Sequence, residues 1–227
     1  ILNRYEQVIV LEDDIQVSPY FLNYMLSALA CYANVTEVAS IHAYLPPLKI
    51  PLPDTFFLRG ADCWGWATWR DRWSLFRSDA DVMAREIRHR GLAKAFDMGG
   101  RVPNLHLLDQ RAAGRSSSWA ICWHASCFLA DRYSLHPGRS LVRNIGLDRS
   151  GEHCIPSPQL QAVLSDQPLS VNSHSIEENP MIVAAFARQL APAPLPYRIL
   201  TRLRTALLRV ASSCSVSYTH LRAHETL

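Results

Sequence analysis

Three consecutive acidic residues, Glu12, Asp13 and Asp14, directly follow the aliphatic run of residues 8–11. Adjacent carboxylates repel one another, so this position calls for a group of opposite charge. The aliphatic run predicts a strand buried on both faces, as in a parallel sheet, and ligands of open α/β sheets bind beyond the carboxyl ends of such strands. Because hard divalent cations take carboxylate oxygens, the pattern predicts a cation that carries a phosphate.

A tryptophan-rich stretch, CWGWATWRDRW, occupies residues 63–73. Trp66, Trp69, Trp73 and Phe76 recur at steps of three, four and three, which is the spacing of one helical face. The spacing therefore predicts a helix with an aromatic face after a turn at Gly65. Trp69 and Trp73 are expected in the core.

The remaining elements follow from turn residues and apolar spacing. Ser18 and Pro19 predict the start of a helix, whose buried face would carry Phe21, Leu22, Met25, Leu29 and Tyr32. Further helices are expected over residues 79–90 and 119–129, strands over 38–41, 56–58 and 140–142, and loops over 46–53, 99–118 and 144–154.

Composition narrows the class of protein. The 227 residues are enough for one sizeable core, and a net charge of +3 gives no argument for a nucleic-acid partner. Six cysteines without a CxxC pair favour reduced thiols and a cytosol-facing protein over disulfides or a zinc site. No apolar stretch reaches the roughly 20 residues of a membrane-spanning helix.

The two ends of the chain lead to separate expectations. Residues 195–210 carry four arginines and seven leucine, isoleucine or valine residues, and no acid. They predict a basic amphipathic helix within 191–213, which either lies on an anionic membrane through 197–210 or packs on the domain. Residues 214–227 resemble a vector- or adapter-derived translation and are excluded from fold reasoning. At the other end, only seven residues precede Val8, so we expect the amino-terminal part of the domain to be missing, leaving that strand with a neighbour on one side only.

Three stretches in series resemble bacterial family-2-like glycosyltransferases with the GT-A fold and, more distantly, N-acetylglucosaminyltransferase I. They are VIVLEDDIQVSPYFLNYM, CWGWATWRDRW and SWAICWHASCFLADRYSLHPGRSLVRNIGLDRSGEHC. The resemblance covers residues 7–154. It implies an α/β fold in which a mixed sheet is flanked by helices, with residues 1–190 forming a partial GT-A catalytic domain.

The resemblance also implies a set of site residues. Asp14 would be the metal ligand for Mn²⁺ or Mg²⁺, while Glu12 and Asp13 would face the donor sugar or ribose. Gly65 would allow close backbone approach, and Trp64 or Trp66 would stack on a sugar. His153 matches a second metal ligand by position and type, whereas His124 is expected to be structural.

The chain departs from the family at the catalytic base. The Glu-Asp pair that usually heads the later helix is absent, and SSSWAICW offers only hydroxyl groups. An inverting transferase needs a carboxylate to take the proton of the acceptor hydroxyl. Asp109 is the first choice, with Asp131 and Asp62 as alternatives.

Together these features predict a metal-dependent, inverting glycosyltransferase. It would move a sugar from a nucleotide-sugar donor to a polysaccharide or lipid-linked acceptor, in the cytoplasm or at the inner face of the membrane. Two alternatives remain open at this point: a nucleotidyltransferase on a related sheet, and a non-catalytic carbohydrate-binding domain.

Overall fold

The computed structural model describes residues 1–146 and 160–192. By its contacts the chain divides into two units, Ile1–Ala191 and Pro192–Leu227, and the first is the unit described below. The predicted ligand His153, the basic helix at 195–210 and the tail at 214–227 lie outside the described residues. Among the described residues, no helix is long and apolar enough to cross a membrane.

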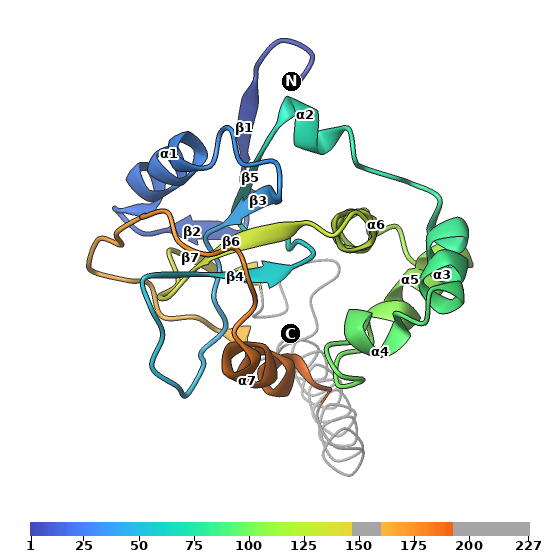
Figure 1. Ribbon diagram of the computed structural model, residues 1–227. Helices are drawn as coiled ribbons and strands as arrows, with labels where there is room; N and C mark the ends of the chain where they lie inside the picture. The colour runs from blue at the N-terminus through green and yellow to red at the C-terminus, as the bar shows by residue number, and fades with distance from the viewer. Residues whose placement is uncertain (147–159, 193–227) are drawn as a thin grey trace, which may run out of the picture. The chain divides into compact units, whose positions relative to one another are not determined.

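The centre of the unit is a mixed five-stranded sheet of order β1-β5-β3-β6-β4 (Figure 1). Its strands are β1 (Gln7–Val10), β3 (Val38–His42), β4 (Thr55–Arg59), β5 (Trp66–Trp69) and β6 (Tyr133–Pro137). β3 and β6 pair in parallel, and the other pairings are antiparallel. β1, β3 and β6 therefore run in one direction, and their carboxyl ends share one edge of the sheet.

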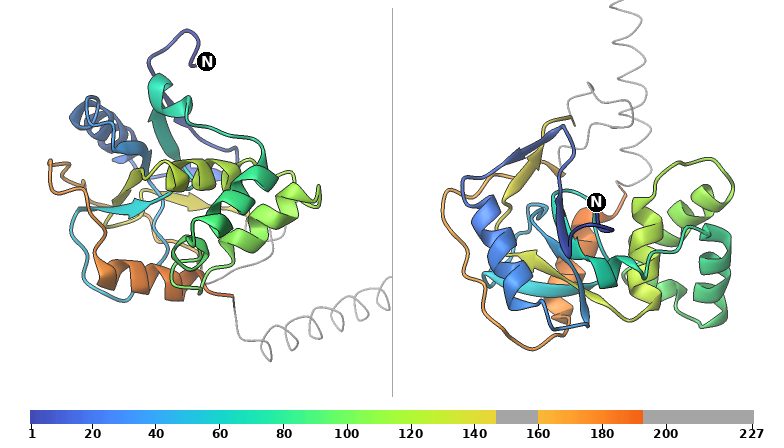
Figure 2. Two further views of the ribbon diagram at one scale, coloured as in Figure 1. Left: turned by 45° about the vertical axis from the view of Figure 1, so that its right-hand side comes forward. Right: turned by 90° about the horizontal axis from the view of Figure 1, so that it is seen from above.

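Helices cover both faces of this sheet (Figures 1 and 2). On one face, α1 (Phe21–Cys31) packs Met25 and Leu29 against Ile41 and Leu135. The other face is covered by α6 (Ala120–Leu129) and α7 (Pro180–Leu190). A layer of α3 (Ala80–His89), α4 (Ala93–Phe96) and α5 (Asn104–Ala112) packs on the outer side of α6. The mixed α/β class with flanking helices is confirmed.

A second, two-stranded sheet lies beside the acidic residues. β2 (Ile15–Val17) pairs antiparallel with β7 (Val142–Asn144), with Ile15 opposite Asn144. Because β2 begins directly after Asp14, this pairing fixes the acidic residues against the segment that follows β7.

Several predicted elements are confirmed. The strands expected at 38–41 and 56–58 and the helices expected at 79–90 and 119–129 all form. β1 pairs only with β5 among the described residues, as expected for a strand with a neighbour on one side. The helix after Pro19 also forms, although Ser18 is not its N-cap: the helix begins at Phe21, and the Ser18 hydroxyl donates to the carbonyl of Ser165.

Other expectations were wrong. Residues 66–69 form strand β5 instead of a helix, and only Arg70–Trp73 (α2) is helical. β1 is antiparallel to β5 and only half-buried, so it is not a parallel strand covered on both faces. Helix α5 replaces part of the loop expected at 99–118. Leu22 is 54% exposed, and Tyr24 and Ala28 take its place on the buried face of α1. The strand expected at 140–142 is shifted to Val142–Asn144.

Candidate functional site

Two glycines show how closely the segments around the acidic residues approach one another. A Cβ atom on Gly146 would lie 2.6 Å from Oδ2 of Asp14, and one on Gly65 would lie 2.8 Å from Cγ1 of Val142. In addition, the amide of Ile145 donates to the carbonyl of Asp14 at 2.8 Å. Strand β7 and Gly146 after it therefore contact both the acidic residues that follow β1 and the loop before β5, at the carboxyl edge of the sheet. We refer to this place as the acidic site.

Asp14 is the most enclosed acid of the triplet. Its side chain is half-buried, whereas Glu12 and Asp13 are exposed. Oδ1 of Asp14 is inaccessible to solvent and has no hydrogen-bond partner among the described residues. A buried polar atom without a hydrogen-bond partner destabilises the fold by on the order of 1–3 kcal/mol, and a charged oxygen by more. A cation or a ligand N–H at this oxygen would offset that penalty.

A fourth carboxylate, that of Asp62 in the loop before β5, lies near the triplet. Burial raises the pKa of Glu12, and the charges of Asp14, Asp62 and Asp13 raise it further, in that order of importance. Because the Glu12 side chain is exposed, solvent screens part of this repulsion. Burial also raises the pKa of Asp62, although N–H groups of Cys63 and Trp64 act in the opposite direction. No Lys or Arg within the described residues forms an ion pair with these four acids.

The loop that carries Asp62 is held by two histidines, the buried His42 and the half-buried His124. Nε2 of His42 accepts a hydrogen bond from the backbone N–H of Asp62 at 3.2 Å. Nδ1 of His124 lies 3.1 Å from the amide nitrogen of Ala61, and a Cβ on Gly60 would lie 2.4 Å from the His124 ring. Oδ1 of Asp62 itself accepts from the amide of Cys63 at 2.7 Å. These contacts fix the Asp62 carboxylate and give His124 the structural role that the sequence predicted.

The aromatic residues of the same loop divide between the site and the core. Trp66 is 3% exposed and packs against Trp73, Trp119 and Trp123, so its ring lies within the aromatic core. Trp64 is only half-buried and packs edge-on against Tyr44, with ring centroids 4.7 Å apart. Of the two rings considered for sugar stacking, Trp64 is therefore the more accessible.

The other two acids considered as catalytic base lie elsewhere. Asp109 is on α5, where both carboxylate oxygens accept from Arg88 at 2.8 and 2.7 Å. In both Figure 1 and Figure 2, α5 lies beyond α6, on the far side from β1 and β2. Asp131 precedes β6 and pairs with Arg59 at the opposite edge of the sheet from the acidic site. Of the three, only Asp62 is near the acid triplet.

The donor atoms fit a hard cation in part. They are carboxylate oxygens, which Mg²⁺ and Mn²⁺ prefer, and Oδ1 of Asp14 has no partner in the described part of the chain. Within the described residues, however, no group of three or more His, Cys, Asp or Glu side chains is arranged to hold a metal. The residues thus suit an open site of the kind in which one or two carboxylates hold Mg²⁺ and substrate phosphates and water complete its ligands.

Comparison of the chain with protein-family models gave no match, and comparison with curated proteins gave none either.

Proposed function

We propose that the protein is a metal-dependent glycosyltransferase that uses a nucleotide-sugar donor. One observation carries the proposal: four carboxylates from two separate segments gather at the carboxyl edge of a mixed sheet, and no Lys or Arg of residues 1–146 or 160–192 forms an ion pair with them. Ligands of α/β sheets bind at such an edge. The acidic residues that follow β1 and the glycine turn at Gly65 are also the features on which the GT-A resemblance rests.

Asp14 would hold the divalent cation, together with phosphate oxygens of the donor. When bound, the cation supplies Lewis-acid stabilisation of the negative charge on the leaving diphosphate. Glu12 and Asp13, which are exposed beside it, would face hydroxyl groups of the donor sugar or ribose. Carboxylates accept hydrogen bonds from hydroxyls in this arrangement.

Asp62 replaces Asp109 as the candidate base, because it lies beside the acid triplet and its loop is fixed by His42. Its carboxylate would take the proton of the acceptor hydroxyl while that oxygen bonds to the anomeric carbon and the nucleoside diphosphate leaves. Burial raises the pKa of Asp62, which makes the carboxylate a better proton acceptor.

The acceptor would be a polysaccharide or lipid-linked glycan, and the reaction would take place in the cytoplasm or at the inner face of the membrane. These assignments follow from the resemblance and from the reduced cysteines.

The proposal is tested by incubating the full chain with UDP-glucose, UDP-galactose, UDP-N-acetylglucosamine or GDP-mannose, with Mn²⁺ or with EDTA. Release of the nucleoside diphosphate in the presence of Mn²⁺, abolished by EDTA and by Asp14→Asn, is the expected result. Absence of Mn²⁺-dependent release from every donor, in a folded protein that binds none of them, would contradict it.

A further inference from the structure

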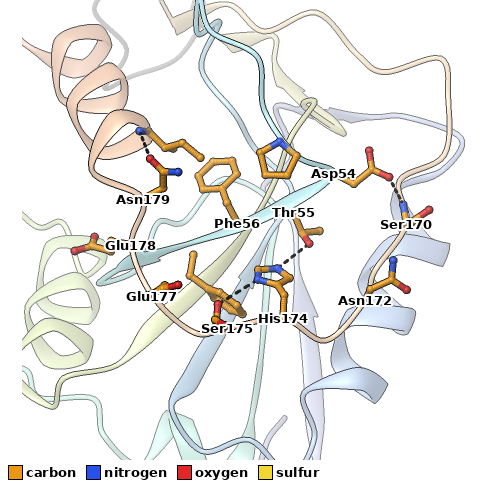
Figure 3. Close-up of a pocket in the computed structure, with 13 residues that line it drawn as sticks. Asp54, Thr55, Phe56, Ser170, Asn172, His174, Ser175, Glu177, Glu178 and Asn179 are labelled. Carbon is orange, nitrogen blue, oxygen red and sulfur yellow. Dashed lines mark hydrogen bonds between the residues drawn. The ribbon is translucent and has the colours of Figure 1, made fainter.

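A cavity of about 510 Å³ lies at the other end of the sheet, against the outer side of β4, where Phe57 forms an isolated parallel bridge with Glu178 (Figure 3). It is open to solvent and lies between β4, the segment of residues 170–179 and the start of α7. Its volume is within the range of roughly 300–1,000 Å³ that is usual for small-molecule sites. Four strand spacings, about 19 Å in all, separate β4 from β1, the strand that the acid triplet follows.

The walls of this cavity are held in place by hydrogen bonds. The amide of Ser170 donates to Oδ2 of Asp54 at 3.0 Å, and Oγ1 of Thr55 lies 3.1 Å from Nε2 of His174. Further along, the amide of Arg59 donates to Oε1 of Glu178 at 3.0 Å. Because these contacts recur along the whole segment, the cavity is formed before any ligand binds.

The floor of the cavity is apolar and the rim is polar. Phe56, whose ring stacks on His136, and Ile182 are both 4% exposed and form the floor together with Pro53. On the rim, the side chains of Asn172 and Glu177 have no hydrogen-bond partner within the part of the chain that the structure describes, and both are exposed. An amide and a carboxylate are thus available to a ligand above an apolar surface.

We propose that this cavity binds a neutral saccharide unit and that this unit is part of the acceptor glycan. The assignment to the acceptor rests on the proposed function. A pyranose presents C–H groups on one face, which suit the apolar floor where Pro53 is exposed. Its hydroxyls can donate to the carboxylate of Glu177 and accept from the amide of Asn172. The neighbouring carboxylates of Glu177 and Glu178 disfavour anionic sugars, since like charges repel.

The separation of β4 from β1 places this unit away from the acid triplet, as a distal part of the acceptor. Binding energy from a remote part of a substrate can position its reacting end. Asn172 and Glu177 would therefore touch no reacting atom. They would act by holding the acceptor chain in place.

The test is saturation-transfer NMR on the full chain with the methyl glycosides of glucose, galactose, mannose and N-acetylglucosamine. Saturation transfer to at least one glycoside is expected. Glu177→Ala and Asn172→Ala should each weaken its binding about tenfold, as expected when a hydrogen bond is lost. Glu37→Gln, an exposed acid on another part of the surface, serves as the control and should bind like the unaltered chain.

Two outcomes would overturn the assignment: no transfer to any of the four glycosides, or transfer that both variants leave unchanged. Binding of a lysine-rich peptide that requires Glu177, without glycoside binding, would instead assign the cavity to a cationic ligand. Asp14→Asn separates this proposal from the previous one, because it should abolish Mn²⁺-dependent donor cleavage and leave glycoside binding intact. Glycoside binding in a protein without donor cleavage would keep the saccharide site and reject the acceptor role.

Discussion

Gly146 packs so closely against the carboxylate of Asp14 that a Cβ atom on the glycine would lie 2.6 Å from Oδ2. The same Cβ would be 3.3 Å from Oδ1 of Asn144, which accepts a hydrogen bond from the Gly146 amide at 2.8 Å. The position of the Asp14 carboxylate therefore depends on the absence of a side chain at residue 146.

Gly146→Ala should displace the Asp14 carboxylate and weaken Mn²⁺ binding by at least about tenfold, because cation sites tolerate little change in ligand position. Titration followed by Mn²⁺ electron paramagnetic resonance measures this. Gly114→Ala is a suitable control: its Cβ meets nothing within 4 Å, but its φ of +68° makes alanine strained by about 1 kcal/mol. An equal loss of Mn²⁺ affinity in the control would attribute the effect to stability alone.

Asp62→Asn should reduce donor turnover by about 10²-fold or more, since a general base contributes on that scale. Asp109→Asn should change turnover little, because it breaks only a surface ion pair with Arg88, which is typically worth about 1 kcal/mol or less. Steady-state kinetics with the donor found active measures both. If Asp109→Asn is the variant that loses turnover, the assignment of Asp62 is wrong.

The buried histidines predict a loss of stability in mild acid. His42 and His136 stack with ring centroids 4.8 Å apart, and Nδ1 of each is buried without a partner among the described residues. Burial, together with the neighbouring histidines, lowers the pKa of His42, and burial with His124 lowers that of His136 to about 3. Both rings are therefore neutral in the folded protein while the unfolded chain binds protons below pH of about 6.5.

Since the unfolded state binds more protons, the free energy of unfolding falls as the pH falls below the unfolded pKa and continues to fall toward the folded one. At pH 5.5 each ring should lower it by about 1.4 kcal/mol relative to neutral pH. Urea unfolding at pH 7.5 and pH 5.5 tests this. The free energy of unfolding should differ less between the two pH values in His136→Phe than in the unaltered chain. An equal difference in the variant would show that His136 is not responsible.

Trp66→Ala should destabilise the fold by about 3–5 kcal/mol, because its ring is buried among three other tryptophans. Trp64→Ala, at a half-buried position, should have a smaller effect. Urea unfolding compares the two. A loss of stability of less than about 1 kcal/mol for Trp66→Ala would remove Trp66 from the core.

The stretch around Trp66 also shows where the sequence was ambiguous. Its aromatic residues have helical spacing, yet β5 is paired with β1 on one side and β3 on the other, and every residue from Trp66 to Trp69 is buried. A strand covered on both faces needs no polar alternation, so periodicity could not distinguish the two structures. Tryptophan also favours strands, and the pairing with two neighbours decided the outcome.

Helix α5 was missed for a different reason. Gly99, Gly100, Pro103 and Gly114 suggested a loop, but they lie outside the helix, with Pro103 directly before it and Gly114 after it. Only Leu108 of α5 is buried, so the apolar pattern was weak. By contrast, β3 and β4 were predicted correctly, because β-branched and aromatic residues between turn-forming segments indicate strands.

For the acidic site, sequence reasoning located the triplet and Gly65, but it ranked Asp62 below Asp109. Asp62 lies 48 positions beyond Asp14, and only the pairing of β5 with β1 brings its loop to the triplet. The contact between Asp14 and Gly146 likewise depends on the pairing of β2 with β7. Such long-range pairings are not encoded in the spacing of any one segment.

The central claim is that Asp14 holds a divalent cation, and the most direct test is the Mn²⁺ binding isotherm of the full chain beside those of Asp14→Asn and Asp13→Asn. The two variants remove the same charge from adjacent positions, but of the two only Asp14 has a buried oxygen without a partner among the described residues. The account predicts that Asp14→Asn weakens binding by at least about tenfold, while Asp13→Asn changes it by no more than about threefold, the size expected for an exposed charge. Equal losses in the two variants, or Mn²⁺ binding that Asp14→Asn leaves unchanged, would contradict it.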